Sequence, residues 1–340
     1  VAASDTIASL AGAGNVTLNS NTLTVGGSSN TTYSGVMSGA GSLVKAGTAT
    51  FTMSGATYTG DTNINAGTLK LTGSLSTATD VVMTNAAVWD LQAAQTVASL
   101  TMASGNSIIN TAGTSSLIVN GASSLANSIT TSGIQTYTGA VILAANTTLN
   151  TTNSAVTFSA GVTGSGNTLT VNAGSGAIST ATLGTSSASL GAVVLNSTGA
   201  TTLGGATYAA SVTTNAGGTV AINTTTVTTT GTQTYNDAVT LGQATTLTGT
   251  TINTVSTVNG GGFNLTITGN ADIGGAITNL NNLSISGTSA LGANVTTTGT
   301  QTYTGAVTIS GSDRTLTGTT INTSSTVNGG GNSLTITGNA

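Results

Sequence analysis

Short runs of alternating apolar and polar residues recur along the whole chain. Leucine, valine or isoleucine alternates with threonine, serine or asparagine in these runs, as at Leu23 and Val25 and again at Leu265 and Ile267. A period of two residues is typical of a strand that buries one face. Glycine or asparagine interrupts each run after a few residues, so the pattern predicts many short strands separated by tight turns.

The same pattern gives no support to helices. No segment shows sustained apolar spacing of three and four residues, and the abundant threonine, valine and isoleucine favour strands because their branched Cβ is restricted in a helix. Proline is absent, which fits a strand-rich chain because proline would remove a hydrogen-bond donor from each ladder. We therefore predict an all-β fold.

Internal repeats select among the all-β architectures. The segment that begins at Val227 returns almost unchanged from Val295, with Tyr235 matched by Tyr303, and a weaker copy begins at Thr130. Such repetition favours a stacked solenoid over a sandwich, because each coil of a solenoid meets similar neighbours. One third of the offset between the two copies is about 23 residues, so we predict a right-handed parallel β-helix (β-solenoid) of about 14 to 15 coils.

The repeats also suggest how the chain is organised. We expect a single continuous β-solenoid over residues 1–340, with degenerate repeats at 130–226 and two near-identical repeats at 227–294 and 295–340. The second of these two copies is truncated, and the chain shows neither an initiating methionine nor a secretion signal. The sequence is therefore expected to be a piece of a longer exported protein.

Charge is almost absent from the chain. Only 3% of its residues are charged, against 37% that are apolar, and histidine and cysteine are missing. Without imidazole or thiolate the common metal and redox sites have no ligands, so we expect no metal and no cofactor. Three basic residues cannot neutralise a run of phosphates, which argues against nucleic acid as a partner, and no apolar run is long enough for membrane insertion.

The seven aspartates lie far apart in the sequence and form no paired motif. Lyases and hydrolases that are built as β-helices need clustered carboxylates to cleave polysaccharides. We therefore expect no enzymatic activity and no catalytic residue. Lys45 and Lys70 are expected at coil edges or on the surface, without a partner.

Residues 34–73 carry a dense series of glycine, threonine and leucine positions. The series consists of Ser38-Gly39-Ala40-Gly41, Leu43, Lys45, Gly47, Ser54-Gly55, Tyr58-Thr59-Gly60, Ile64-Asn65 and Gly67-Thr68-Leu69. In these positions the segment resembles the passenger-associated transport repeat of autotransporters, although Ala49-Thr50-Phe51 departs from the usual Gly-Thr-Leu. The C-terminal TGTQTYTGAVT units are similar to the repeats of filamentous-haemagglutinin-like exported adhesins. Both resemblances imply a β-helix at the outer surface of a Gram-negative bacterium.

Four tyrosines stand out as candidate ligand contacts. Tyr33, Tyr58, Tyr137 and Tyr303 each precede Ser-Gly or Thr-Gly, so we expect them at an equivalent bend in different coils. A row of exposed rings could stack on sugar rings, whereas the alternative is that these rings pack the corner of the coil.

Together these observations predict a non-enzymatic structural or adhesive rod segment of a large exported bacterial surface protein, with a role in adhesion, biofilm or extracellular matrix. One alternative is the subunit of a self-assembling extracellular fibre, and another is a β-helix that binds or degrades polysaccharide. The expected partners are further copies of the chain, end to end or side by side, or glycans of a host or surface.

Overall fold

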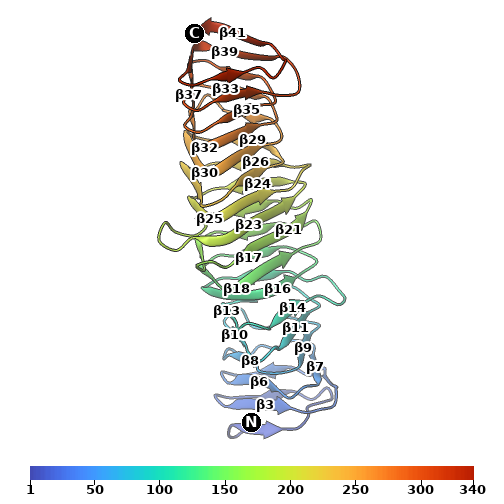
Figure 1. Cartoon of the computed structure of the whole chain (residues 1–340). Helices are drawn as coiled ribbons and strands as arrows, with labels where there is room; N and C mark the ends of the chain where they lie inside the picture. The colour runs from blue at the N-terminus through green and yellow to red at the C-terminus, as the bar shows by residue number, and fades with distance from the viewer. The chain divides into compact units, whose positions relative to one another are not determined.

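A computed structural model describes all 340 residues, of which 55% lie in strands and none in a helix (Figure 1). The chain forms two compact units, Val1–Gly176 and Ala177–Ala340. No helix that could cross a membrane is present. The single continuous solenoid over the whole chain stays a prediction.

The strands are short and numerous in both units. The first unit contains β1 (Asp5–Ile7), β2 (Val16–Thr17), β3 (Thr22–Gly26), β4 (Thr31–Tyr33), β5 (Met37–Ser38), β6 (Ser42–Ala46), β7 (Thr50–Met53), β8 (Thr62–Ile64), β9 (Thr68–Leu71), β10 (Asp80–Met83), β11 (Val88–Leu91), β12 (Gln95–Val97), β13 (Ser99–Met102), β14 (Ser107–Ile109), β15 (Leu117–Val119), β16 (Ser123–Thr130), β17 (Gln135–Tyr137), β18 (Val141–Asn150), β19 (Val156–Phe158), β20 (Val162–Thr163) and β21 (Leu169–Gly174). The second contains β22 (Ile178–Thr180), β23 (Leu190–Ser197), β24 (Ala200–Leu203), β25 (Thr207–Thr214), β26 (Thr219–Ile222), β27 (Thr226–Thr229), β28 (Gln233–Tyr235), β29 (Ala238–Leu241), β30 (Thr245–Thr254), β31 (Val258–Asn259), β32 (Leu265–Ile273), β33 (Ile277–Leu280), β34 (Leu283–Ile285), β35 (Ser289–Leu291), β36 (Val295–Thr297), β37 (Thr300–Tyr303), β38 (Val307–Ile309), β39 (Arg314–Thr323), β40 (Val327–Asn328) and β41 (Leu334–Asn339).

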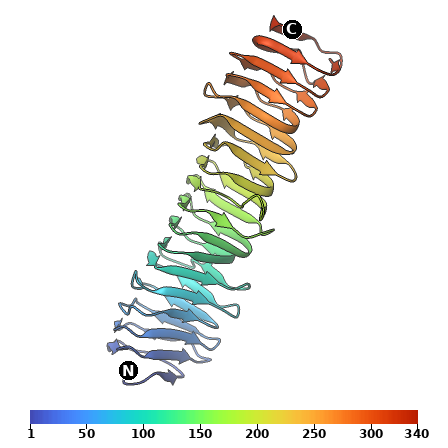
Figure 2. The ribbon, with the colours of Figure 1, turned by 90° about the vertical axis from the view of Figure 1, so that its left-hand side faces the viewer.

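Within each unit the strands of successive coils pair in parallel and lie over one another, as Figure 2 shows from a second side. In the first unit one column of register partners runs through Leu23, Leu43, Thr62, Val81, Leu100, Ser123, Val141 and Val162. In the second unit another column runs through Thr207, Val227, Leu247, Ile267, Ile285, Tyr303 and Thr323. The parallel β-solenoid is therefore confirmed.

The coils are shorter and more numerous than the sequence predicts. The chain holds about 17 turns, with a coil length of roughly 20 residues. The predicted 14 to 15 coils are too few, because the sequence repeat does not correspond to three whole coils.

The two near-identical repeats begin on different faces of the second unit. Val295 matches Val227 in the sequence, but its column in the stack is that of Val239, Val258 and Ile277. Three whole coils separate Val227 from Ile285, and two further strands lead from Ile285 to Val295. One repeat thus spans about three and two-thirds coils, since each coil contributes three strand segments.

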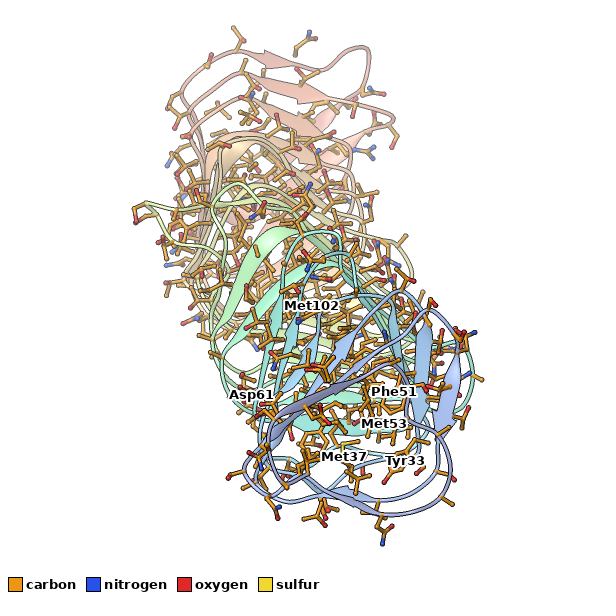
Figure 3. The ribbon with its side chains drawn as sticks, turned by 90° about the horizontal axis from the view of Figure 1, so that it is seen from below. Tyr33, Met37, Phe51, Met53, Asp61 and Met102 are labelled. Carbon is orange, nitrogen blue, oxygen red and sulfur yellow. The ribbon has the colours of Figure 1, made fainter.

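The inward positions of the strands form a continuous aliphatic core in each unit. Figure 3 shows Tyr33, Met37, Phe51 and Met53 in the interior of the first unit, and all four are at most 1% exposed. Outward positions of the same strands carry mostly threonine, serine and asparagine. This division follows from the alternation in the sequence, because successive side chains of a strand point to opposite faces.

Candidate functional site

The four candidate tyrosines are buried. Tyr33 is 1% exposed, and Tyr58, Tyr137 and Tyr303 are fully buried. The Tyr137 ring stacks on Phe158 of the next coil with ring centroids 5.3 Å apart. The prediction of an exposed row of rings that could bind sugars is therefore wrong. The rings instead pack the corners of the coils.

The glycine that follows each of these tyrosines by two residues lies where two coils come close together. A Cβ added to Gly139 would lie 2.3 Å from the backbone of Gly121 in the preceding coil, and one added to Gly305 would lie 2.3 Å from the Gly287 carbonyl oxygen. Adjacent coils thus approach so closely at the bend that only glycine fits. The Tyr-Thr-Gly motif reflects close packing between coils, not a ligand contact.

A buried glutamine completes two of these corners, at Tyr137 and Tyr303, and an equivalent corner at Tyr235. Gln135 donates from Nε2 to the carbonyl oxygens of Ile129 and Asn150, while its Oε1 accepts from the Tyr137 hydroxyl at 3.1 Å. Gln233 and Gln301 make the same set of contacts around Tyr235 and Tyr303. Burial raises the pKa of these tyrosine hydroxyls, so they stay protonated and donate.

Lys45 lies inside a corner and not on the surface. Its side chain is 2% exposed, and Nζ donates to the carbonyl oxygens of Ala46, Gly47 and Ala66, each at 2.9 Å. Burial lowers the pKa of this amine. The surface position expected for Lys45 is wrong, since the side chain joins two successive coils through backbone carbonyls.

A polar groove crosses the outer face of strands β4, β7, β9, β11 and β14 in the first unit. Its volume is about 470 Å³. Its floor follows one row of register partners, one from each strand: Thr32, Thr52, Lys70, Asp90 and Ile109. Asn30, Thr31, Thr50, Thr68 and Thr111 complete the lining. We call this cavity the polar groove.

The two charges of the polar groove lie side by side on neighbouring coils. Lys70 and Asp90 are register partners in β9 and β11. Asp90 is 3% exposed, and its carboxylate accepts from the Thr111 backbone amide at 3.0 Å, the Thr111 hydroxyl at 2.6 Å and Gln92 at 3.2 Å. Lys70 is half-buried, and its ammonium makes no hydrogen bond or ion pair within the protein.

Asp90 is the one carboxylate that lines the polar groove, whereas glycoside cleavage uses a pair of carboxyl groups on either side of the bond. No group of three or more acidic, histidine or cysteine side chains is placed to hold a metal ion. The groove offers hydroxyls, one amide, one ammonium and one carboxylate.

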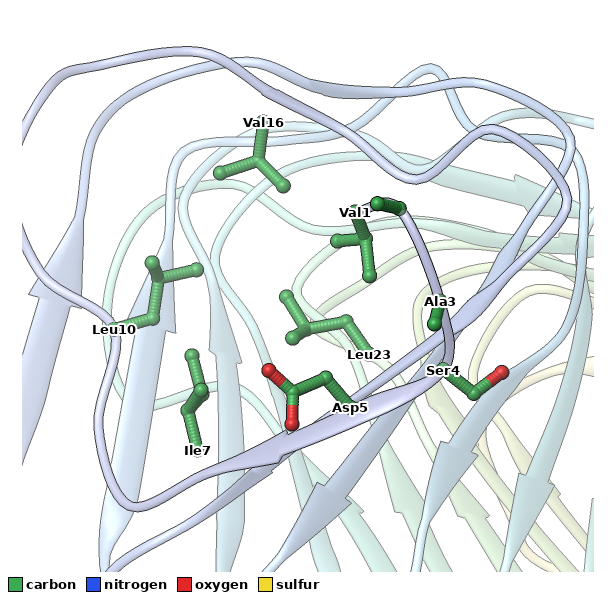
Figure 4. Close-up of a pocket in the computed structure, with 9 residues that line it drawn as sticks. Val1, Ala3, Ser4, Asp5, Ile7, Leu10, Val16 and Leu23 are labelled. Atoms are coloured by element: carbon green, nitrogen blue, oxygen red, sulfur yellow. The ribbon is translucent and has the colours of Figure 1, made fainter.

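A cavity of about 480 Å³ lies at the first turn, and most of its lining residues are exposed or half-buried. It is lined by Val1, Ala2, Ala3, Ser4, Asp5, Ile7, Leu10, Val16 and Leu23 (Figure 4). Its walls are mostly aliphatic, and Ile7 and Leu23 stand in the same ladder as the core residues of the next coils. The cavity is therefore the place where the inward rows of the first unit reach its first coil.

Comparison with known families bears on the segment that carries Lys45 and the middle of the polar groove. Residues 43–71 match the family model described as the passenger-associated-transport-repeat. With the β-solenoid, this match fits an autotransporter passenger-like protein. The passenger-associated repeat implies that the chain is secreted or exposed at a surface. Comparisons with curated proteins and with solved structures give no match.

The passenger-associated repeat contributes four lining residues of the polar groove, which sequence reasoning missed. They are Thr50, Thr52, Thr68 and Lys70. Asp90 follows Lys70 by one coil of roughly 20 residues, and the longer coil expected from the repeat would have separated the two. The inward position of Lys45 had a signal in the sequence, because Lys45 shares the alternation of the buried Leu43.

Proposed function

We propose that this chain is a non-enzymatic structural or adhesive segment of an exported passenger at the outer surface of a Gram-negative bacterium. The observation that carries the proposal is the passenger-associated repeat at 43–71, set in a stack of parallel coils. Such a stack buries its backbone hydrogen bonds between coils and leaves long outward faces available for contacts.

The test is display on cells. The chain is fused between a secretion signal and an autotransporter barrel in a Gram-negative host, and intact cells are treated with protease and then assayed for adherence to glass and to polysaccharide-coated surfaces. We expect protease-accessible protein and increased adherence compared with cells that display the barrel alone. Protein retained inside the cells would contradict the proposal as a whole, and displayed protein without any gain in adherence would contradict its adhesive part.

A separate experiment tests the proposal that the chain is not an enzyme. Purified chain is incubated with neutral and acidic polysaccharides, and the release of reducing ends is measured over a day. We expect no release, because the polar groove holds a single carboxylate. Release that disappears in Asp90→Asn would show a hydrolase or lyase instead.

Self-assembly into fibres is the second candidate function, and the uncharged outward rows of the second unit favour it. Thr246 and Thr248 of β30 are register partners of Thr266 and Thr268 of β32, so neutral hydroxyls repeat from coil to coil. Faces without like charges have little repulsion to keep two copies apart. Light scattering against protein concentration decides this candidate, since a monomer that persists at high concentration would contradict it.

A further inference from the structure

The polar groove has the composition of a ligand site, and we propose that it binds a neutral, hydroxyl-rich oligosaccharide. This inference rests on the adhesive role proposed above, for which it supplies a location and a ligand class. Three features of the groove carry it: an ammonium without a partner, a fixed carboxylate beside that ammonium, and rows of hydroxyls on successive coils.

The first feature is that the Lys70 ammonium has hydrogen-bond donors that the protein does not use. A lysine ammonium has three N–H donors, and none of those of Lys70 is used within the protein. The side chain is only half-exposed, because its stem lies in the groove between Thr52 and Asp90. A ligand oxygen in the groove would therefore meet a charged donor that no protein group already occupies.

The second feature, the Asp90 carboxylate, decides the charge of the ligand. Thr111 and Gln92 hold this carboxylate in the groove, between Lys70 and Ile109, and Oδ1 accepts only one hydrogen bond within the protein. An anionic sugar would be attracted by the Lys70 ammonium but repelled by the Asp90 carboxylate on the adjacent strand. A neutral sugar can accept from Lys70 and donate to Asp90 with separate hydroxyls, so the pair favours a neutral ligand.

The third feature is the repetition of small polar groups along the groove. Thr50 and Thr68 are register partners, as are Thr32 and Thr52, so hydroxyls recur at the strand spacing of about 4.8 Å. Asn30 accepts the Thr50 backbone N–H at 2.8 Å through Oδ1, which leaves its amide N–H groups as donors at the groove edge. Repeated donors and acceptors in one line suit a chain of sugar units better than a single small molecule.

The experiment measures binding to two hexasaccharides by isothermal titration calorimetry. Cellohexaose is the neutral probe and hexagalacturonate is the acidic probe, each titrated into the full chain at low and high salt. We expect cellohexaose to bind with little dependence on salt, because no net charge is exchanged, and hexagalacturonate to bind more weakly.

Variants locate the site. Lys70→Met keeps the aliphatic stem and should weaken cellohexaose binding about tenfold, since one hydrogen bond to a charged donor is lost. Thr52→Val should weaken it less. Asn63→Ala is the matched control, because Asn63 is an outward residue of the same coils on the face formed by β6, β8 and β10, and it should bind like the unmodified chain. Equal melting temperatures show that the variants are folded.

Several results would overturn the inference: no binding of cellohexaose at millimolar concentration, binding that Lys70→Met leaves unchanged, or tighter and salt-sensitive binding of hexagalacturonate. The inference and the proposed function can fail separately. Displayed cells that adhere equally well with Lys70→Met would support adhesion and overturn the role of the groove. Purified chain that binds cellohexaose while displayed cells do not adhere would support the site and contradict the adhesive role.

Discussion

Buried glutamines are the residues on which the corners of the coils depend. Gln135 satisfies two backbone carbonyls and one tyrosine hydroxyl in a position that is fully closed to water. A buried polar group that loses its partner costs about 1–3 kcal/mol, much more than the net gain from an average hydrogen bond. The glutamine therefore matters mainly through the groups that it would leave unpaired.

Gln135→Leu should lower the free energy of unfolding by about 3–5 kcal/mol, because it leaves several buried groups unpaired. Tyr137→Phe should cost about 1–3 kcal/mol, since only Gln135 Oε1 loses its partner. Thr136→Ala lies on the outward face of the same strand and should change stability by no more than about 1 kcal/mol. Urea unfolding followed by circular dichroism measures all three. A Gln135→Leu variant as stable as Thr136→Ala would contradict this account.

Asp237 makes the stability of the second unit depend on pH. It stands where the matching copy has Gly305, is 1% exposed, and accepts one hydrogen bond, from the Gly218 backbone amide, while Oδ2 has no partner. Burial raises the pKa of this carboxyl. The folded state therefore holds the proton more tightly than the unfolded chain does, so stability falls as the pH rises from about 4 through the folded pKa.

Asp237→Asn removes this titration and should raise the free energy of unfolding at pH 7 by about 1 kcal/mol, because no unpaired charge is buried. The difference between the variant and the unmodified chain should shrink toward pH 3, where the carboxyl is protonated in both states. Urea unfolding at several pH values gives this difference directly. A difference that stays constant between pH 3 and pH 7 would show that Asp237 does not titrate as described.

At the scale of the strand and its bend, the alternation of the sequence was enough to predict which strands form, and it was not enough to place the bends. Inward residues such as Leu265 and Ile267 follow the two-residue period within a strand. Tyr137 follows the same period, since Gln135 and Tyr137 are buried on either side of the outward Thr136. The polar Gln135 at the inward position hid this pattern in the sequence. The sequence did not reveal the polar groove, because the coil length inferred from the repeat was too long. Lys70 and Asp90 are neighbours only in the shorter coils that the structure has.

Gly139→Ala tests the close contact between coils at a bend. The added Cβ would lie 2.3 Å from the Gly121 backbone, so one coil must move and the free energy of unfolding should fall by about 2 kcal/mol or more. Gly14→Ala is the matched control, because nothing lies within 4 Å of its added Cβ. That control should be neutral or more stable by up to about 1 kcal/mol. Equal melting temperatures for the two variants would contradict the close-contact explanation.

At the scale of the whole chain, the repeated sequence is compatible with more than one face of the solenoid. Gln233 lies in the column of Val212 and Ile252, whereas its sequence match Gln301 lies in the column of Leu283 and Ile321, yet both make the same hydrogen bonds. Each of the three strand segments in a coil needs inward aliphatic residues and a bend, so the same sequence satisfies any of them. A repeat therefore need not equal a whole number of coils.

This independence of face predicts that a chain shortened by one sequence repeat folds. Deletion of residues 227–294 joins Thr226 to Val295 and places Val295 over Thr207, in the position that Val227 holds in the full chain. We expect an unchanged strand signal per residue in circular dichroism and a cooperative thermal transition, because every bend of the moved copy meets a bend of the preceding coil. Deletion of 227–289 is the matched control, since it joins Thr226 to Ala290 and brings the turn at Gly292 into a strand position. The control should aggregate or melt at a much lower temperature. If the two deletions behave alike, the repeat can fold on only one face of the solenoid. The shared hydrogen bonds of Gln233 and Gln301 would then not be enough for the same sequence to fold on another face.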